Sequence, residues 1–253
     1  MPVPLGDPLE LSDDELDDES EVTEADIEEA KRKFSNAEIA AFLLLLGYVW
    51  SSQTGAYIDL DTGDVVKTAA VRSALELVID KAALNMGGLS QKLKDGEITL
   101  AAWQTGMMKE IKLAHTTAGA AANGGWENML ASDWGAVGQR VRSQYDYLRN
   151  FAGEIADGKQ PLDGRFLVRS DMYADATRDT YEDIRRRGMI SNGYDEAMRI
   201  LDPGAAHCDD CEEYAADGWV PVDEVHPIGD SECNVRCKCE IVYRNSETGE
   251  ESE

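Results

Sequence analysis

The chain has 253 residues, 43% of them hydrophobic, which is enough apolar content to bury a core and excludes a disordered protein. Its 50 acidic and 24 basic residues give a formal charge of −26, and this excludes a broad nucleic-acid surface, because affinity for phosphate backbones comes from Lys and Arg. The apolar run from Ala40 to Leu46 is far shorter than the roughly 18 residues of a membrane span, so we expect no membrane segment.

Residues 1–22 form the first expected segment. They contain early prolines and an almost unbroken acidic run, Asp13 to Glu21. Like charges at this density repel each other and bury little, so the composition predicts a flexible acidic tail. Such a tail is either simply solvated or an arm that docks on a basic partner. The acidic charge could also reflect adaptation to high salt, which composition does not decide.

Residues 23–202 are expected to form a helical domain. A helix opens at Thr23 or Glu24, and Ser35 to Glu38 resembles a capping box for a second helix that ends near Gly47. Residues 57–66 predict a short hairpin whose turn contains Asp-Thr-Gly. That triplet also occurs in aspartic proteases, but one copy in a turn is weak evidence for catalysis.

Further helices are expected from the spacing of apolar residues. One covers residues 68–94 with a bend at Gly87-Gly88, and one runs from the cap Thr99 to about His115. The most regular lies between residues 132 and 157, and another covers 165–187, where Arg185 to Arg187 suit a helix end better than a nucleic-acid contact. A short helix is expected at 194–201.

The cysteine-rich module, residues 203–243, is the most informative stretch. All five cysteines of the chain lie between His207 and Cys239. Cys-x2-Cys followed by Cys-x3-Cys-x-Cys has the layout of a small zinc module in which two knuckles share one tetrahedral ion. The expected zinc ligands are Cys208, Cys211, Cys237 and Cys239, with Cys233, His207 and His226 as alternates.

Two alternatives to this zinc module remain open. A pair of disulfides with one free thiol would suit a secreted or assembled particle, and the thiols could also be reduced and unliganded. A catalytic zinc of the deaminase type is discarded, because no His-x-Glu or Pro-Cys-x-x-Cys is present. The expected fold class is mainly α with a small zinc-stapled β module, α+β overall, followed by a polar tail at 244–253.

The module resembles a known family. It is similar to the C-terminal motif of tailed-phage minor head proteins, the head-morphogenesis or phage Mu F-like group. The residues that carry the likeness are His207-Cys208-x2-Cys211, Gly218 to Pro221, Gly229, and Cys233-x3-Cys237-x-Cys239 before a short strand, with weaker similarity at Gly96 to Trp103, Gly124 to Trp126, Asp133 to Gly135 and Gln144 to Ala152. The family ends in His-Pro-x-Cys-Arg-Cys, whereas here His226-Pro227 lies well ahead of Cys233.

The resemblance implies a non-catalytic minor capsid protein of a virion. Its partners would be the portal or the major capsid protein, it could form an oligomer within the particle, and it would act in head assembly or genome delivery. It would be found in the host cytoplasm during assembly. One alternative is a zinc-dependent, virus-encoded hydrolase or transferase using His207, Asp209 and a cysteine. The other is a protein-interaction adaptor with an acidic tail.

Overall fold

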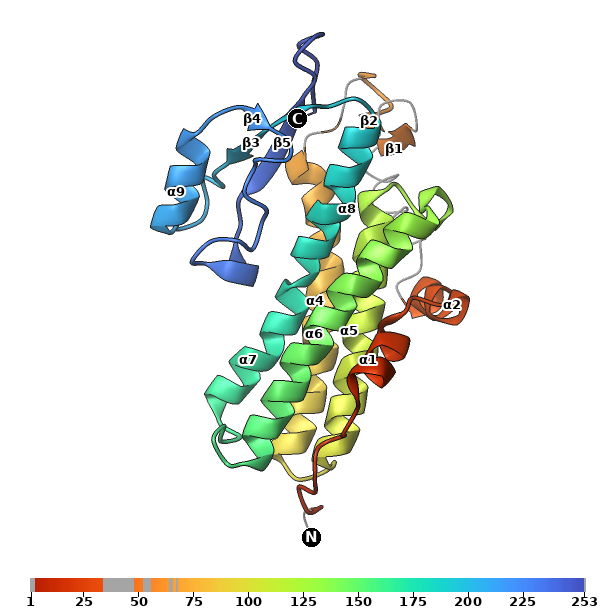
Figure 1. Cartoon of the computed structure of the whole chain (residues 1–253), viewed down its shortest axis with the longest axis vertical. Coiled ribbons are helices and arrows are strands. Elements are labelled where there is room, and N and C mark those ends of the chain that lie inside the picture. Colours follow the sequence, from red (N-terminus) through yellow and green to blue (C-terminus); the bar gives the residue numbers. More distant parts are fainter. Residues whose placement is uncertain (1–2, 34–47, 52–55, 64–65, 67, 253) are drawn as a thin grey trace. The chain divides into compact units, whose positions relative to one another are not determined.

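The computed structural model describes residues 3–33, 48–51, 56–63, 66 and 68–252. The fold is α+β and mainly helical, with a small strand-containing C-terminal region (Figure 1). The α-helices are α1 (Asp13–Ser20), α2 (Glu24–Lys33), α4 (Thr68–Lys94), α5 (Leu100–Ala122), α6 (Ala131–Ala156), α7 (Gly164–Asp175), α8 (Thr177–Ser191) and α9 (Asp209–Ala216). The strands are β1 (Tyr48–Ser51), β2 (Ala56–Asp59), β3 (Glu196–Ile200), β4 (Val220–Pro221), β5 (Glu240–Arg244) and β6 (Glu251–Ser252), and the 3-10 turns are η1 (Trp126–Asn128) and η2 (Asn234–Arg236).

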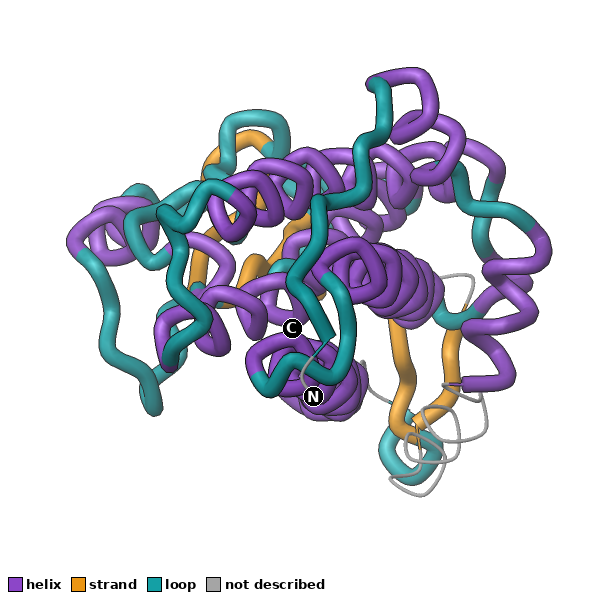
Figure 2. Tube along the Cα trace, turned by 90° about the horizontal axis from the view of Figure 1, so that it is seen from below, coloured by secondary structure: helices purple, strands orange, loops and turns teal. Residues whose placement is uncertain are grey.

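The chain divides into two compact units. Unit 1 comprises Met1–Lys33, Val78–Thr117 and Leu130–Thr177, and unit 2 comprises Phe34–Leu77, Ala118–Met129 and Arg178–Glu253. Unit 1 is helical, whereas the described strands all belong to unit 2. In Figure 2 these strands form two separate groups, the β1–β2 pair and the C-terminal sheet.

An aromatic triangle forms the centre of unit 1. Trp103 of α5, Phe151 of α6 and Phe166 of α7 are completely buried, with ring centroids 5.5 to 5.7 Å apart. The indole N–H of Trp103 donates to the Ser90 hydroxyl of α4 at 3.0 Å, so its one polar atom is satisfied inside the core. This cluster joins α4, α5, α6 and α7.

The N-terminal segment differs from the flexible tail that its composition predicts. Ser12 and Glu15 form a capping box at the start of α1, which lies against α6, and Leu16 is only 1% exposed. Upstream, the Val3 N–H donates to the Gly96 carbonyl at 2.6 Å. The prediction of a flexible tail was wrong for α1, because it considered only the repulsion between like charges and not the burial of Leu16.

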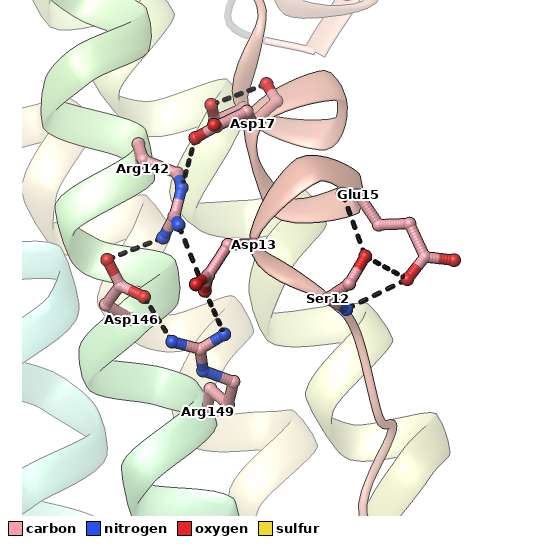
Figure 3. A network of polar contacts seen from close by, with 8 residues as sticks. Ser12, Asp13, Glu15, Asp17, Arg142, Asp146 and Arg149 are labelled. Carbon is pink, nitrogen blue, oxygen red and sulfur yellow. Dashed lines mark hydrogen bonds and ion pairs between the residues drawn. The ribbon is translucent and has the colours of Figure 1, made fainter.

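Arginines of α6 provide the counter-charges for this acidic segment (Figure 3). Arg142 forms ion pairs with Asp17 and with Asp146 on its own helix, while Arg149 contacts Asp13 at 2.8 Å and Asp146 at 2.8 Å. The hydrogen bond from Arg149 and its positive charge lower the pKa of Asp13. Asp146 therefore orients the two arginines toward Asp13 and Asp17, which lie far from α6 in the sequence.

In unit 2, β1 and β2 pair antiparallel as a hairpin. The hairpin expected at 57–66 is thus shifted toward the N-terminus: its first run is β2, which pairs with the preceding strand. Asp59 accepts backbone N–H bonds from Asp61 and Thr62, and Gly63 has a φ of 77°, so the Asp-Thr-Gly triplet forms a tight turn. This geometry gives the triplet a structural role.

The C-terminal sheet has the order β4-β3-β5-β6, and each described pairing is antiparallel. Its central strand β3 corrects the expectation of a helix at 194–201. Ala197 and Arg199 point into the core while their neighbours are more exposed, which is the two-residue period of a strand. The alternation was not recognised in the sequence because one of the two inward positions is Arg199, a residue type that is usually exposed. Since β3 lies before residue 203 and pairs with β5, this sheet crosses the expected start of the cysteine module.

Other boundaries shift less. Helix α4 continues through Gly87 and Gly88, α5 extends past His115 to Ala122, and the helix expected at 165–187 is divided at Ala176 into α7 and α8. The polar tail contains β6, and its Ser252 hydroxyl accepts from the Tyr243 N–H at 3.1 Å. The helix expected between residues 36 and 47 lies outside the described residues.

Candidate metal centre

The start of α9 and the segment before β5 together present all five cysteines. Cys208 is the N-cap of α9 and Cys211 lies in its first turn, while Cys233 and Cys237 flank η2 and Cys239 directly precedes β5. Cys211, Cys237 and Cys239 are fully buried, and they belong to an apolar cluster that also includes Ile241 and Tyr243 of β5. The sequence thus places two cysteine-bearing turns on one small core.

The sulfur atoms lie close enough together to share a metal ion. Cys211 Sγ lies 3.5 Å from Cys233 Sγ and 3.7 Å from Cys237 Sγ. A disulfide bond would bring two sulfurs to about 2.05 Å, and all five cysteines are free thiols in this structure. A tetrahedral zinc ion with Zn–S bonds of about 2.3 Å holds its sulfur ligands about 3.8 Å apart. The observed distances match that geometry.

Two overlapping groups of thiols could hold a metal ion. One contains Cys208, Cys211 and Cys233, the other Cys211, Cys237 and Cys239, and within each group the sulfurs lie within 4.8 Å of one another. The four expected ligands are divided between the two groups: Cys208 lies in the first together with the alternate Cys233, and Cys237 and Cys239 lie in the second. Cys211 is common to both groups, so it is the central residue of the site.

The two histidine alternates differ in their surroundings. His207 Nδ1 lies 3.8 Å from Cys239 Sγ, and its Nε2 lies 2.7 Å from the Asp202 carbonyl oxygen. A carbonyl partner fixes the proton on Nε2 and leaves Nδ1 free to accept or to ligate. His226 is exposed and stacks on Tyr214, with ring centroids 3.9 Å apart, and belongs to neither thiol group.

Sequence reasoning missed Arg199 of β3, which is 1% exposed. Its Nη1 lies 3.4 Å from Cys237 Sγ and 3.7 Å from Cys211 Sγ, and its Nη2 donates to the carbonyl oxygens of His226 and Pro227 at 2.8 Å each. The guanidinium also lies over the Tyr214 ring at 5.1 Å. The signal that could have found it was an arginine in a segment with a strand-like alternation of small and polar residues.

The thiols differ in how readily they ionise. At Cys208 burial opposes ionisation, but hydrogen bonds from Cys211 and Cys233 outweigh it and lower the pKa to about 7. At Cys237 burial is again outweighed, by a backbone hydrogen bond from Cys239 and by the Arg199 charge, so the pKa is lowered. Burial raises the pKa of Cys239 to about 12, with the charge of Cys237 adding to the effect. Thiolate, the form that binds metals, is thus favoured at one position in each group.

Side-chain contacts fix the cysteine turns to their surroundings in unit 2. The Asp210 carboxylate accepts the Glu232 N–H at 2.8 Å, which links the start of α9 to the turn that carries Cys233. Lys238, between two cysteines, lies 3.5 Å from Glu76 of α4, and Glu76 in turn makes a two-pronged ion pair with Arg178 at 2.9 and 2.6 Å. These contacts connect the two cysteine turns to each other and to α4 and α8.

Other residues singled out in the sequence have structural surroundings. Arg185 is buried, donates to the Ile241 carbonyl at 2.6 Å and lies 5.1 Å from the Tyr243 ring, so it supports the C-terminal sheet; α8 continues past it to Ser191. His115 is 1% exposed, and its burial lowers its pKa to about 3. Asp209, named for a catalytic zinc, is exposed at the first position of α9.

Comparison with protein-family models, with curated proteins and with solved structures finds no match to this chain. Among the helices of the described residues, none combines the length and the apolar character that crossing a membrane requires. The chemistry of the cysteine centre is therefore the main guide to function.

Proposed function

We propose that the cysteine centre binds a structural zinc ion and that the chain is a non-catalytic minor structural protein of a tailed-virus head. The observation that carries the first part is the position of Cys211 in an apolar core: its sulfur lies 3.7 Å from Cys237 Sγ, and it shares one group of close thiols with Cys237 and Cys239 and another with Cys208. A sulfur–sulfur distance of that size is what two ligands of one tetrahedral zinc ion have. Zinc is the metal because thiolates are soft ligands, and a closed thiolate set is its usual structural site.

The ligand set is Cys208, Cys211, Cys237 and Cys239, with Cys233 and His207 as the nearest substitutes. Five thiols and one imidazole exceed the four positions of a tetrahedral ion. A catalytic zinc needs one position open to water, whereas this surplus closes the shell with protein atoms. The zinc therefore supplies folding free energy to a region of short strands and turns.

The cysteine motif begins at His207-Cys208 and ends at Cys239. The head-protein role rests on the likeness of this motif to the phage Mu F-like group. The ion pairs near the thiols support a structural role, because Glu76, Arg178 and Lys238 connect the turn that carries Cys237 and Cys239 to α4 and α8. A module held by such contacts suits a fixed contact with a portal or capsid protein.

The zinc is tested by the metal content of protein purified without added metal and by the spectrum after cobalt substitution. We expect one zinc per chain and the ligand-field bands of a four-coordinate, thiolate-rich cobalt site. Cys211→Ser should lose the metal, while the matched control Glu212→Ser, on an exposed neighbour in the same helix, should retain it. A cobalt spectrum with a water ligand would reject the structural assignment in favour of the hydrolase or transferase.

The head assignment is tested by a pull-down of the tagged chain from cells in which the encoding virus multiplies, with the bound proteins identified by mass spectrometry. Portal or major capsid protein should be recovered. The control is the double variant Asp13→Asn with Asp17→Asn, which removes two exposed acidic charges of α1, keeps the buried Leu16 and should recover the same proteins. An eluate that contains only soluble host proteins rejects the head role, and loss of all partners in the double variant supports the acidic-arm adaptor instead.

A further inference from the structure

Arg199 carries a full positive charge in a place where water does not reach it. The side chain is 1% exposed, and in the part of the chain that the structure describes no carboxylate pairs with it. Its Nε is buried without a hydrogen-bond partner. An uncompensated charge in a protein interior is strongly destabilising, so a guanidinium at this position needs an anion.

The groups that face Arg199 identify that anion. Its Nη2 is occupied by two backbone carbonyl oxygens, which carry only partial charge. Its Nη1 donates toward two sulfurs, at 3.4 Å to Cys237 and 3.7 Å to Cys211, which are hydrogen-bond distances for a sulfur acceptor. The candidate anion is therefore the thiolate cluster.

We infer that Arg199 is the charge partner and positioning residue of the metal centre: it donates to metal-bound thiolates of Cys211 and Cys237 and ties the His226-Pro227 turn to them. This inference rests on the proposed zinc site. Four thiolates around one divalent ion leave a net charge of about −2, which one guanidinium reduces to about −1. Hydrogen bonds from outer partners of this kind orient ligands and tune the metal.

The position of Arg199 on β3 explains how it can do this. Arg199 pairs with Ile241 across the sheet, only two residues beyond the ligand Cys239. Tyr214 of α9 covers the guanidinium from another side, and α9 also carries Cys211. One side chain on β3 thus reaches both cysteine turns, and its backbone is held by the pairing with β5.

The test compares Arg199→Met, which removes the charge and the donors, with Arg199→Lys, which keeps the charge. The matched control is Arg244→Met, on the neighbouring strand β5. The described partners of Arg244 are Glu196 and the Trp219 ring. Each zinc-loaded protein is mixed with a chromophoric chelator, and the rate of zinc transfer is measured. Loss of an outer partner typically weakens a metal site about 10- to 100-fold.

We expect Arg199→Met to release zinc at least about 10-fold faster than the unmodified protein, Arg199→Lys to lie between them, and Arg244→Met to be unchanged. In cobalt-substituted protein, Arg199→Met should shift the sulfur-to-cobalt charge-transfer band to longer wavelength, because thiolates without N–H donors are better electron donors. A merely structural arginine would not move this band.

The outcomes separate the two proposals. A zinc-loaded protein in which Arg199→Met leaves both the release rate and the band unchanged overturns the role of Arg199 and leaves the zinc site standing. If Arg199→Met is obtained only unfolded, the band of Arg199→Lys decides: an unshifted band with an unchanged release rate overturns the inference. An unmodified protein that contains no metal overturns both proposals.

Discussion

Leu16 should hold the N-terminal segment on α6 more strongly than the ion pairs around it. The side chain is 1% exposed, and Leu→Ala changes at buried positions cost about 2–5 kcal/mol, so we expect about 2 kcal/mol for a surface helix that can partly relax. The acidic partners are mostly solvated, with side-chain exposures of 75% for Asp13 and 66% for Asp17. Exposed pairs of this kind contribute about 0–1 kcal/mol each.

The assay is hydrogen exchange of backbone amides in residues 3–20, followed by mass spectrometry. A cost of about 2 kcal/mol corresponds to roughly 30-fold faster exchange through local opening. The double variant Asp13→Asn with Asp17→Asn should accelerate exchange less, and added salt should have little effect on the unmodified chain. The control Leu84→Ala removes a leucine that is 77% exposed on α4 and should leave the segment protected.

The reasoning is refuted if the double asparagine variant exposes the segment as much as Leu16→Ala does. It is refuted equally if 1 M salt releases the segment in the unmodified chain. Either result would mean that the arrangement in Figure 3, in which Arg142 and Arg149 bridge the carboxylates of α1 to Asp146, acts as a network stronger than the sum of its exposed pairs.

Three further predictions concern the core and the thiols. Cys208→Ser should lose metal and unfold the cysteine turns while the helical melting transition remains; unchanged metal content and melting would contradict this. Burial holds the pKa of His115 at about 3 against an ordinary 6.5, so the unfolded chain binds the extra proton between these values and stability should fall on acidification, by up to about 1.4 kcal/mol per pH unit. His115→Gln should flatten that slope in denaturant titrations at several pH values, and an equally steep slope would rule out this histidine as its source. Trp103→Phe leaves the Ser90 hydroxyl without its donor and should cost about 1–3 kcal/mol in chemical unfolding, whereas a loss below about 0.5 kcal/mol would show that the bond is replaceable.

The sequence was most informative where a pattern was local. The helix around Val137, Val141 and Tyr145 has apolar residues at regular spacing, and the structure contains it as α6 with these residues buried. The convergence of the cysteines was also readable, because knuckle spacing is a local signal. Which thiols group together was not, since Cys211 belongs to both groups and Cys233 is as close to it as Cys237 is.

Features that depend on distant partners were missed. Strand β3 was taken for a helix because its inward positions hold Ala197 and Arg199, and the charge of Arg199 is compatible with burial only when the sulfurs and carbonyls of another segment surround it. In the same way, α1 is held by arginines that lie more than a hundred residues along the chain. A single-sequence pattern contains neither partner.

The pairing of β3 with β5 has a consequence for the order in which this region assembles. Arg199 opposes Ile241, so every cysteine lies within the loop that this pairing must close. Contacts between the two cysteine turns, which are 26 residues apart at Cys211 and Cys237, shorten that loop before the strands meet. The entropic cost of closing a loop grows with its length. Contact between the cysteine turns therefore lowers the cost of pairing β3 with β5, and strand pairing lowers the cost of bringing the cysteine turns together. Capture of the proposed zinc ion and strand pairing should therefore occur as one cooperative step, and newly made chain should acquire both together.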